Sequence, residues 1–348
     1  MKRATKPSPK KIPTSRRKAV GESQADWVTV QPMVPGRAHP TVVKPKIEGL
    51  ALNDWAAQNR EYVQELWEEK RAVVFRDFDL GGIPGFQKFT ELTSESERLP
   101  YVDRSTPREE HGPNIYCSTI YPSEDSIRLH NEGSYWSVHP KKAYFCCMTV
   151  PDEGGETPIG NVQAVYERID PAIRQEFAER KWMLARNYNE GFALKWEEVF
   201  QTDDRAEVEA YCAKNGIECE WQGEGGLRTK QVRDAIMKHP RTGELLWHNH
   251  AAFFHITTRD AHVRDALMNE FASEELPYNT YYGDGGEIDP EVIQHINEAY
   301  DAELVKFAWQ AGDVMLIDNC SIAHGRQPYV GERLVLVALM EGFATDEA

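Results

Sequence analysis

The fold of this chain is constrained most by a series of short apolar segments, rich in β-branched and aromatic residues, that recur from residue 72 onward. Strands are predicted for residues 72–80, 144–150, 181–188, 244–254, 313–319 and 333–340. No glycine-rich phosphate loop follows any of these strands, and too few helical intervals separate them to build a repeated βαβ unit. We therefore predict a mainly β fold with flanking helices, built on an antiparallel jelly-roll or barrel core.

Five further segments have the apolar spacing of helices, namely 52–71, 170–180, 206–215, 259–272 and 290–303. Asp170 and Asp289 each precede a proline, which is typical of an N-cap residue followed by proline at the first helical position. Residues 26–50 are proline-rich and lack periodicity, so we expect an arm that wraps around the rest. We interpret residues 26–348 as a single domain with a helical insert at roughly 190–300.

The net charge of the chain excludes two classes of partner. There are 40 Lys and Arg residues against 56 Asp and Glu, so the formal net charge is −16 at pH 7. Nucleic acid and anionic membrane surfaces both attract basic proteins, so we expect neither as a partner. Residues 1–25 form a basic segment whose Pro, Ser and Lys content predicts a disordered tail. Docking of this tail to an acidic partner is the alternative interpretation.

The cysteines contain no C-x-x-C pair, and their spacing predicts neither a zinc cluster nor a disulfide framework. They are Cys117, Cys146, Cys147, Cys212, Cys219 and Cys320. No apolar run is long enough to span a membrane. We therefore expect a cytoplasmic protein.

The stretch RLHNEGSY (128–135) places His130 and Glu132 two positions apart, after an apolar segment. If this stretch is a strand, both side chains point to the same face. Such a pair could hold a metal ion, form a hydrogen bond, or be coincidence. With 11 His and 56 acidic residues in the chain, roughly two such pairs are expected by chance, so the spacing alone decides nothing.

Three residues downstream favour the metal interpretation. His324 follows a predicted strand and turn, and two histidines with one carboxylate fit the facial triad of non-haem Fe(II), which leaves three coordination positions open. Arg333, at the start of the last strand, could anchor the far carboxylate of a chelating keto acid. The Thr157 hydroxyl, after a glycine turn, could donate a second hydrogen bond to that carboxylate. Each residue alone has an ordinary structural interpretation, and their joint order favours a site.

Five short motifs occur in one order, and together they resemble the TauD/TfdA family of Fe(II)/2-oxoglutarate dioxygenases. They are HNE (130–132), GGETPI (154–159), RNY (186–188), HP-x-TGE (239–244) and HGRQPYVGER (324–333). Within the family the chain is most similar to the SyrP-like branch, which modifies amino acids in natural-product assembly. The resemblance extends from about residue 60 to residue 342.

The resemblance implies a double-stranded β-helix with iron bound by His130, Glu132 and His324, and with 2-oxoglutarate bound by Arg333 and Thr157. It implies a dioxygenase that uses O2 and 2-oxoglutarate as co-substrates. The expected reaction is hydroxylation of an unactivated C–H bond of an amino acid or amino-acid-derived substrate, either free or tethered to a peptidyl carrier protein.

The chain departs from the family pattern at two positions. Many relatives have Asp where this chain has Glu132, and both residues can bind a metal. Some relatives carry a second arginine at the position of Val337, where it helps to bind an anionic substrate, so a sulfonate-like substrate is disfavoured here. Family halogenases lack the carboxylate ligand, so Glu132 favours hydroxylation. Desaturation and cyclisation are the alternatives.

Substrate contacts are predicted for Asn131, between two of the candidate ligands, and for Asn249, which matches the SyrP-like pattern. For Asn249, a buried strand with a satisfied amide is an equally good interpretation. Trp247 and Phe254 could form an apolar wall. Arg326 could contact a carboxylate near the iron, although a structural ion pair is the favoured interpretation.

Two other classes of protein compete with this hypothesis. The stretch WHNHAA (247–252) contains the letters of an H-N-H nuclease, but a nuclease needs a cationic surface and this chain is acidic. A jelly-roll binding protein without activity would keep the same fold. The presence of all three metal-ligand types and of the arginine argues against it.

Overall fold

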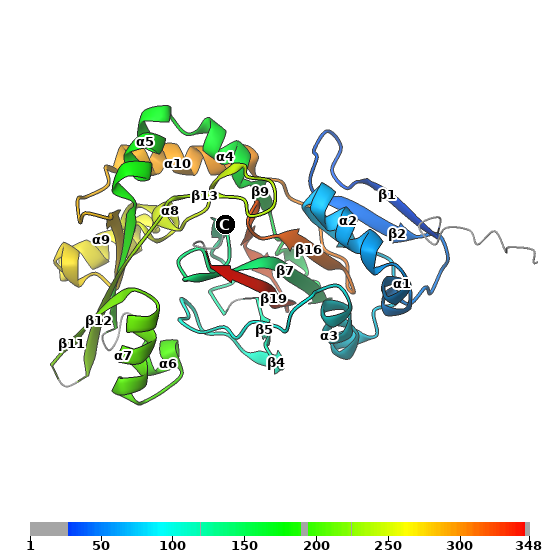
Figure 1. Ribbon diagram of the computed structural model, residues 1–348, viewed down its shortest axis with the longest axis horizontal. Coiled ribbons are helices and arrows are strands. Elements are labelled where there is room, and N and C mark those ends of the chain that lie inside the picture. Colours follow the sequence, from blue (N-terminus) through cyan, green and yellow to red (C-terminus); the bar gives the residue numbers. More distant parts are fainter. Residues whose placement is uncertain (1–26, 119, 189–193, 224, 345–348) are drawn as a thin grey trace, which may run out of the picture.

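The computed structural model describes residues 27–118, 120–188, 194–223 and 225–344. The predicted basic tail at 1–25 lies outside these residues. The molecule is elongated, with the N-terminal strands and helices at one end, a small sheet with its helices at the other, and the core strands between them (Figure 1). Within the described part of the chain, no helix has the length and apolar character needed to cross a membrane.

The largest sheet has eight strands in the order β1-β2-β3-β16-β7-β19-β5-β4. Their bounds are β1 Val28–Pro32, β2 Thr41–Pro45, β3 Ala72–Phe75, β4 Glu110–Gly112, β5 Ile115–Cys117, β7 Val138–Thr149, β16 Val314–Asp318 and β19 Leu334–Ala344. All neighbours in this sheet are antiparallel except β2 and β3. The segment expected to be an irregular arm therefore contributes two strands to the edge of the sheet.

The central strands of this sheet are buried on both faces. On β7, Tyr144 and Cys146 pack in one hydrophobic cluster, with residues of helices α1 (Leu52–Gln58), α2 (Arg60–Lys70) and α3 (Gly82–Leu92). The alternate residues Phe145 and Cys147 pack in a second cluster on the inner side. Burial of both faces explains why these strands read as continuous apolar runs rather than as an alternation.

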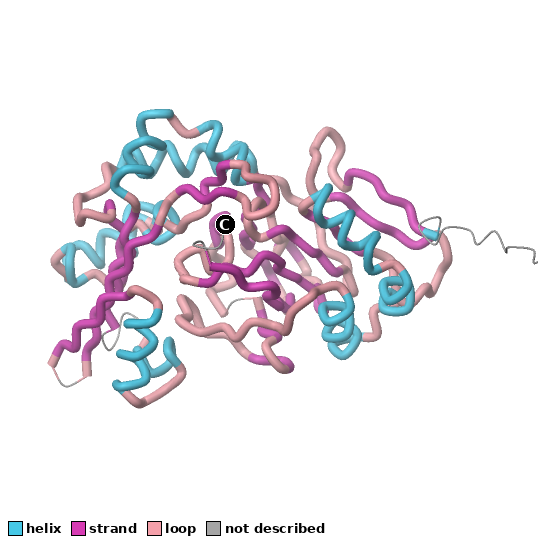
Figure 2. The backbone as a smooth tube through the Cα atoms, viewed as in Figure 1, coloured by secondary structure: helices cyan, strands magenta, loops and turns pink. Residues whose placement is uncertain are grey.

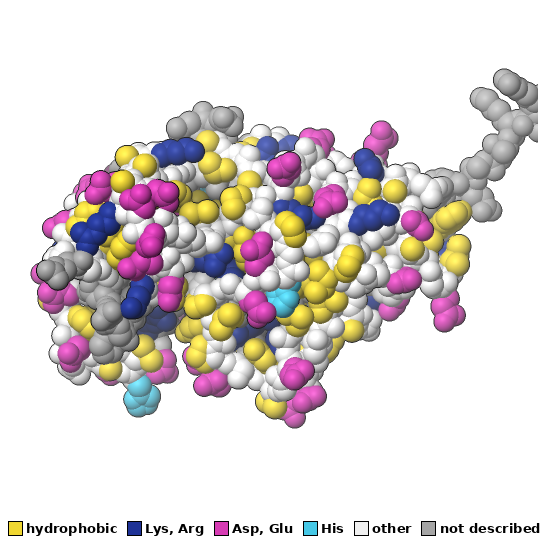
Figure 3. Space-filling view, turned by 90° about the horizontal axis from the view of Figure 1, so that it is seen from below, with side chains coloured by type: hydrophobic (Ala, Val, Ile, Leu, Met, Phe, Trp, Pro, Cys, Tyr) yellow, Lys and Arg dark blue, Asp and Glu magenta, His cyan; other side chains and the backbone are white. Residues whose placement is uncertain are grey.

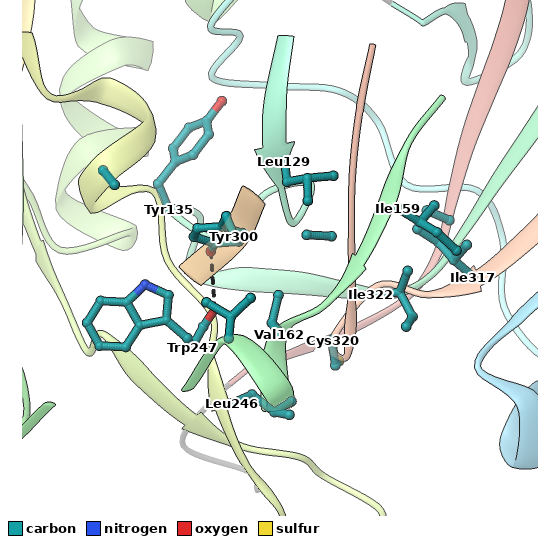
Figure 4. Close-up of a cluster of buried hydrophobic side chains, with 14 of the residues drawn as sticks. Leu129, Tyr135, Ile159, Val162, Leu246, Trp247, Tyr300, Ile317, Cys320 and Ile322 are labelled. Atoms are coloured by element: carbon teal, nitrogen blue, oxygen red, sulfur yellow. Dashed lines mark hydrogen bonds between the residues drawn. The ribbon is translucent and has the colours of Figure 1, made fainter. Parts of the chain in front are cut away.

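A second sheet has three strands in the order β6-β17-β9, with bounds Ile127–His130, Ile322–Arg326 and Ile159–Asn161. A short pair, β8 (Glu153–Gly154) and β18 (Tyr329–Val330), lies next to it in the chain. Leu129 of β6 and Ile159 of β9 belong to the same hydrophobic cluster as Phe145 and Val337 of the large sheet. Figure 4 shows part of this cluster, including Leu129. Two sheets around one core form the predicted jelly roll, so the predicted fold class is confirmed.

The segment expected to be a helical insert is mixed rather than helical. Its sheet has the order β11-β12-β10-β15, and a hairpin, β13-β14, follows β12. The bounds are β10 Trp182–Tyr188, β11 Ile217–Gln222, β12 Gly226–Arg233, β13 Ile236–Lys238, β14 Leu245–Trp247 and β15 Tyr278–Tyr282. The strand predicted over 244–254 ends at Trp247, and helix α8 (Ala251–Phe254) follows. Periodicity cannot separate strand from helix in so short an apolar run.

The remaining helices lie outside the core strands (Figure 2). They are α4 Val162–Arg168, α5 Pro171–Arg180, α6 Trp196–Phe200, α7 Arg205–Lys214, α9 Ala261–Glu270 and α10 Pro290–Glu303, with 3-10 turns at Ile256–Thr258 and Ser273–Glu275. Both predicted N-caps are confirmed. A carboxylate oxygen of Asp170 accepts from the Ala172 amide at 2.7 Å, and one of Asp289 accepts from the Glu291 amide at 2.9 Å.

Candidate active site

The second sheet brings two histidines together. His130 is the last residue of β6, and His324 lies directly opposite it on the antiparallel strand β17. Their ring centroids are 4.5 Å apart, and the ring of Phe145 packs against His324 at 4.6 Å. Cross-strand pairing thus joins two residues that are far apart in the chain.

Glu132 is placed beside the two histidines by a turn and not by strand pairing. It lies in a turn after β6, so the alternation of a strand does not explain its position. The Asn319 side chain accepts from the Glu132 amide at 2.9 Å and donates to the Glu132 carbonyl at 2.9 Å. The Asn131 amide group donates to the Asn319 carbonyl at 2.7 Å. This turn is therefore held against the turn between β16 and β17.

The three side chains converge as a set of metal donors. One donor atom from each of His130, Glu132 and His324 lies within 4.8 Å of the others, and His324 Nε2 is 3.8 Å from Glu132 Oε2. His130 Nδ1 donates to the Arg128 carbonyl at 2.9 Å, which leaves the Nε2 lone pair available. Two imidazoles and one carboxylate, with nothing of the described chain completing a fourth ligand, fit Fe(II) better than a closed zinc site.

The electrostatics of the cluster favour the metal-binding protonation states. Burial, followed by the neighbouring His324, lowers the pKa of His130 to about 4, so its imidazole is neutral near pH 7. Burial alone raises the pKa of Glu132, but the Arg108 guanidinium and the two histidines bring that pKa well below its usual range. The carboxylate is therefore ionised and able to bind a cation.

Two residues that contact Glu132 were missed by sequence reasoning. Arg108 Nη2 donates to Glu132 Oε2 at 3.0 Å, and the Tyr101 hydroxyl donates to Glu132 Oε1. Arg108 also donates to the Tyr101 oxygen at 2.7 Å. Both residues lie in an irregular segment with no motif and no periodicity, so the sequence carries no signal for them.

Arg333 and Thr157, the residues expected to bind 2-oxoglutarate, are in contact with each other. Arg333 donates to Thr157 Oγ1 at 3.2 Å, to Ser118 Oγ at 3.1 Å and to the Gly155 carbonyl at 2.9 Å. Among the residues that the structure describes, no carboxylate pairs with Arg333. Burial, together with the nearby Arg326, lowers the pKa of Arg333 to about 10. A partly buried cation without a counter-ion is suited to an anionic ligand.

The Thr157 hydroxyl is oriented by its neighbours. Its oxygen accepts from the Trp309 indole N–H at 3.0 Å as well as from Arg333. With both contacts directed at the oxygen, the O–H remains as a donor. A carboxylate held by Arg333 could accept that hydrogen bond.

Two cavities meet at the candidate metal ligands. The inner cavity is lined by His130, Glu132 and His324 together with Thr157 and Arg333. The outer cavity has a volume of about 560 Å³ and also contacts His130 and Glu132. Both cavities therefore reach His130 and Glu132, and the inner cavity also reaches His324.

The residues of the stretch WHNH (247–250) lie in different parts of the structure. His250 lines the outer cavity, whereas His248 lines a separate cavity and Trp247 is fully buried against Phe177. Since the two histidines of this stretch face different cavities, they do not form one nuclease-type metal site. Of the apolar wall predicted from Trp247 and Phe254, only Phe254 lines the outer cavity.

The two asparagines expected to contact substrate make structural hydrogen bonds. Asn249 donates to the Ala235 carbonyl at 2.8 Å and accepts from the Ala251 amide at 2.9 Å, at the start of α8. Asn249 lines a fourth, smaller cavity, and Asn131 is fully buried. Neither residue lines the outer cavity.

Arg326 is buried and lines the inner cavity, but the favoured structural ion pair does not form with any described carboxylate. Its guanidinium donates instead to the carbonyls of Tyr121 at 3.0 Å and Asp125 at 2.7 Å, and to that of Pro122. Arg326 therefore holds the loop 121–125, which forms part of the outer cavity.

A jelly roll in which paired strands present two histidines, next to a turn that supplies a carboxylate, is the architecture of oxygenases that use Fe(II) and 2-oxoglutarate. Comparison with known proteins agrees with this class. Residues 31–340 match the family described as taurine catabolism dioxygenase TauD, TfdA family. The chain belongs to this family and is a 2-oxoglutarate-dependent dioxygenase.

Curated relatives match nearly the whole chain. The dapdiamide synthesis protein DdaC of Enterobacter agglomerans is 38% identical over 313 residues, covering 90% of this chain and 94% of DdaC. A clavaminate synthase-like protein of Arabidopsis thaliana is 26% identical over 341 residues, covering 90% of this chain and 99% of the relative.

A solved structure has the same fold. That of PvcB from Pseudomonas aeruginosa matches with a TM-score of 0.51 at 14% identity, covering 90% of this chain and 91% of PvcB. PvcB is an Fe, alpha-ketoglutarate dependent oxygenase from an isonitrile synthetic pathway.

Proposed function

We propose that this enzyme hydroxylates an unactivated C–H bond of an amino acid or amino-acid-derived molecule in natural-product biosynthesis. The observation that carries the proposal is the convergence of His130, Glu132 and His324 where two cavities meet. The similarity to DdaC, a dapdiamide synthesis protein, supports a role in the assembly of a natural product. In this proposal the outer cavity takes the substrate and the inner cavity takes 2-oxoglutarate.

Each residue of the proposed site has a role that follows from its contacts. His130, Glu132 and His324 bind Fe(II), while Arg333 and Thr157 bind the far carboxylate of 2-oxoglutarate. When bound, Fe(II) with 2-oxoglutarate and O2 supplies the oxidising power for attack on a C–H bond. The chain itself keeps the His130 imidazole neutral and the Glu132 carboxylate ionised, and it orients the bound molecules.

The outer cavity carries charges of both signs, which suits a zwitterionic substrate. Arg128 and Arg259 line it together with Glu124, Asp125 and Asp260. An α-amino acid carries one positive and one negative group, so acidic and basic wall residues can each bind one of them.

Aromatic side chains form the apolar part of the same cavity. Phe253 and Phe254 line it, their rings pack edge to face with centroids 5.0 Å apart, and Phe253 also packs against His130 at 4.8 Å. Such a wall excludes water beside the proposed iron ligand and can hold the apolar part of a substrate.

The form in which the substrate arrives is part of the proposal. An amino acid tethered to a peptidyl carrier protein is the alternative to a free amino acid, and only the tethered form requires a protein partner.

We also propose that the enzyme works in the cytoplasm. All six cysteines are free, as expected for a chain kept in a reducing compartment.

The test is a substrate screen under controlled oxygen. Anaerobic enzyme is loaded with Fe(II) and 2-oxoglutarate, mixed with amino acids in free or carrier-loaded form, and then exposed to O2, with succinate as the readout. We expect one substrate class to stimulate succinate release and to gain one oxygen atom by mass spectrometry. Loss of two hydrogen atoms would instead identify desaturation or cyclisation.

The controls separate the proposal from its alternatives. His324→Ala should release no substrate-dependent succinate, because it removes one proposed metal ligand. A wild-type enzyme that binds Fe(II) and 2-oxoglutarate but responds to no amino acid in either form would overturn the proposed substrate class. A protein that consumes no 2-oxoglutarate at all would support an inactive binding protein.

A further inference from the structure

We propose that Arg108 is a positioning residue that couples the metal-binding carboxylate of Glu132 to the 2-oxoglutarate arginine, Arg333, through Ser118. This inference rests on the proposed roles of Glu132 and Arg333. It assigns a function to a buried arginine that no sequence motif contains.

The first half of the coupling is the contact between Arg108 and Glu132. The two side chains are 3% and 5% exposed, and their closest atoms are 3.0 Å apart. Tyr101 completes a triangle, because its hydroxyl accepts from Arg108 and donates to the other oxygen of Glu132. Both carboxylate oxygens are therefore held from the protein side, and each keeps a lone pair for a metal ion.

The second half runs through Ser118. Arg108 Nη1 donates to the Ser118 carbonyl at 2.6 Å, and Arg333 Nη1 donates to the Ser118 hydroxyl at 3.1 Å. One residue thus accepts from both arginines. The Ser118 amide donates to the Val335 carbonyl at 2.7 Å, which ties this residue to β19 just after Arg333.

The geometry requires arginine rather than any cation. Arg108 uses Nη1 for Ser118 and Nη2 for Tyr101 and Glu132, while its guanidinium lies 4.1 Å from the centroid of the Tyr101 ring. A lysine ammonium at the same place keeps the charge but cannot span these partners in a fixed plane. A shift of Glu132 would therefore reach Arg333 through atoms in direct contact.

The coupling predicts that a substitution which disturbs Glu132 weakens the binding of 2-oxoglutarate as well as the binding of the metal. Replacing Arg108 leaves Glu132 buried with one partner fewer, so the carboxylate no longer has a single orientation. Losing such a partner of a metal ligand typically weakens metal binding by about 10- to 100-fold. Loss of the Ser118 hydroxyl should leave Glu132 in place and shift Arg333, which donates to that hydroxyl.

The experiment compares Arg108→Gln, Arg108→Lys and Ser118→Ala with the wild-type chain. Co(II) affinity is measured by calorimetry without 2-oxoglutarate, and 2-oxoglutarate affinity by the visible absorption of the anaerobic Fe(II) complex. We expect Arg108→Gln to weaken Co(II) binding by about 10-fold or more and also to weaken 2-oxoglutarate binding, with partial recovery in Arg108→Lys. Ser118→Ala should weaken 2-oxoglutarate binding several-fold while Co(II) affinity stays within about twofold.

Arg104→Gln is the matched control, because Arg104 lies in the same segment as Arg108. Its guanidinium donates hydrogen bonds to the Tyr101 carbonyl and to the Gln201 side chain and none to Glu132. Thermal unfolding of every variant separates lost binding from lost folding, and Arg108→Lys with Ser118→Ala decides the question if Arg108→Gln does not fold. Wild-type affinities in the folded Arg108 variants would overturn the coupling. Failure of the wild-type chain to bind Co(II) would overturn the proposed metal site instead.

Discussion

Buried charge sets the properties of individual residues in this site. Glu132 is compensated by Arg108 and Tyr101 within the chain, so its negative charge is stable before any metal binds. Arg333 has hydrogen-bond acceptors but no acidic partner among the described residues. Glu132 is therefore part of a closed network, whereas the partly buried Arg333 is suited to bind an anion.

This difference leads to a prediction for Arg333→Gln. Charged hydrogen bonds contribute roughly 1.5–3 kcal/mol each, so the KM for 2-oxoglutarate should rise roughly 10- to 100-fold. Co(II) affinity should be nearly unchanged, because Arg333 does not contact the metal-ligand candidates. Arg180→Gln, which removes an exposed ion pair with Asp284, is the control and should leave both quantities unchanged. An unaltered KM in Arg333→Gln would contradict the assignment.

At the scale of secondary-structure elements, the site depends on the close approach of β6 and β17. Gly325 lies between His324 and Arg326 on β17, where the pairing register shifts. A Cβ atom at this position would lie 2.5 Å from the Ile127 carbonyl oxygen, and that oxygen belongs to the backbone of β6. Only glycine allows the two strands to approach this closely.

We therefore predict that Gly325→Ala separates the two strands. The chain should lose roughly 1–3 kcal/mol of unfolding free energy, and Co(II) affinity should fall because His130 and His324 face each other across this pair. Chemical denaturation and calorimetry measure the two effects. Gly225→Ala, where a Cβ would meet nothing within 4 Å, should change neither. If Gly325→Ala kept both the stability and the affinity of the wild type, strand spacing would not position the histidines.

At the scale of the whole molecule, elements from distant parts of the chain pack around the site. The helices at the N-terminal end cover the outer face of the large sheet (Figure 1). The mixed insert contributes residues to the outer cavity. On the face seen in Figure 3, acidic and basic side chains are interspersed and do not form a large patch of one sign.

Buried neutral histidines should make the whole fold sensitive to acid. Burial lowers the pKa of His139 and of His255 from the ordinary value of 6.5 to about 4. As the pH falls below 6.5, the unfolded chain binds protons that the folded chain does not, so unfolding becomes more favourable until about pH 4. Each histidine can cost up to about 1.4 kcal/mol per pH unit in this window.

Urea denaturation of the metal-free chain at about pH 7 and about pH 5 tests this prediction. We expect a lower free energy of unfolding at the acidic pH, and a smaller difference between the two pH values in His139→Gln and in His255→Gln than in the wild type. Equal pH dependence in all three chains would show that these histidines are not the cause.

Features that depend on neighbouring residues could be predicted from the sequence. The N-caps Asp170 and Asp289, the helices that follow them and the apolar strands of the core are local patterns, since helix caps and residue periodicity act over a few positions. The convergence of His130, Glu132 and His324 was expected from the order of short motifs. That expectation rested on the resemblance to the family. The strand alternation predicted for residues 128–135 does not explain the position of Glu132, because Glu132 lies in a turn.

Only the tertiary structure decided which side chains surround these residues. Arg108 and Tyr101 meet Glu132, Asn319 holds its turn, and His250 lines the outer cavity beside it, while Asn249 does not. Contacts of this kind join positions that are up to 187 residues apart, and their geometry depends on how every intervening element packs. Local periodicity contains no information about such distances, so candidate donors could be named from the sequence, whereas the side chains that surround them could not.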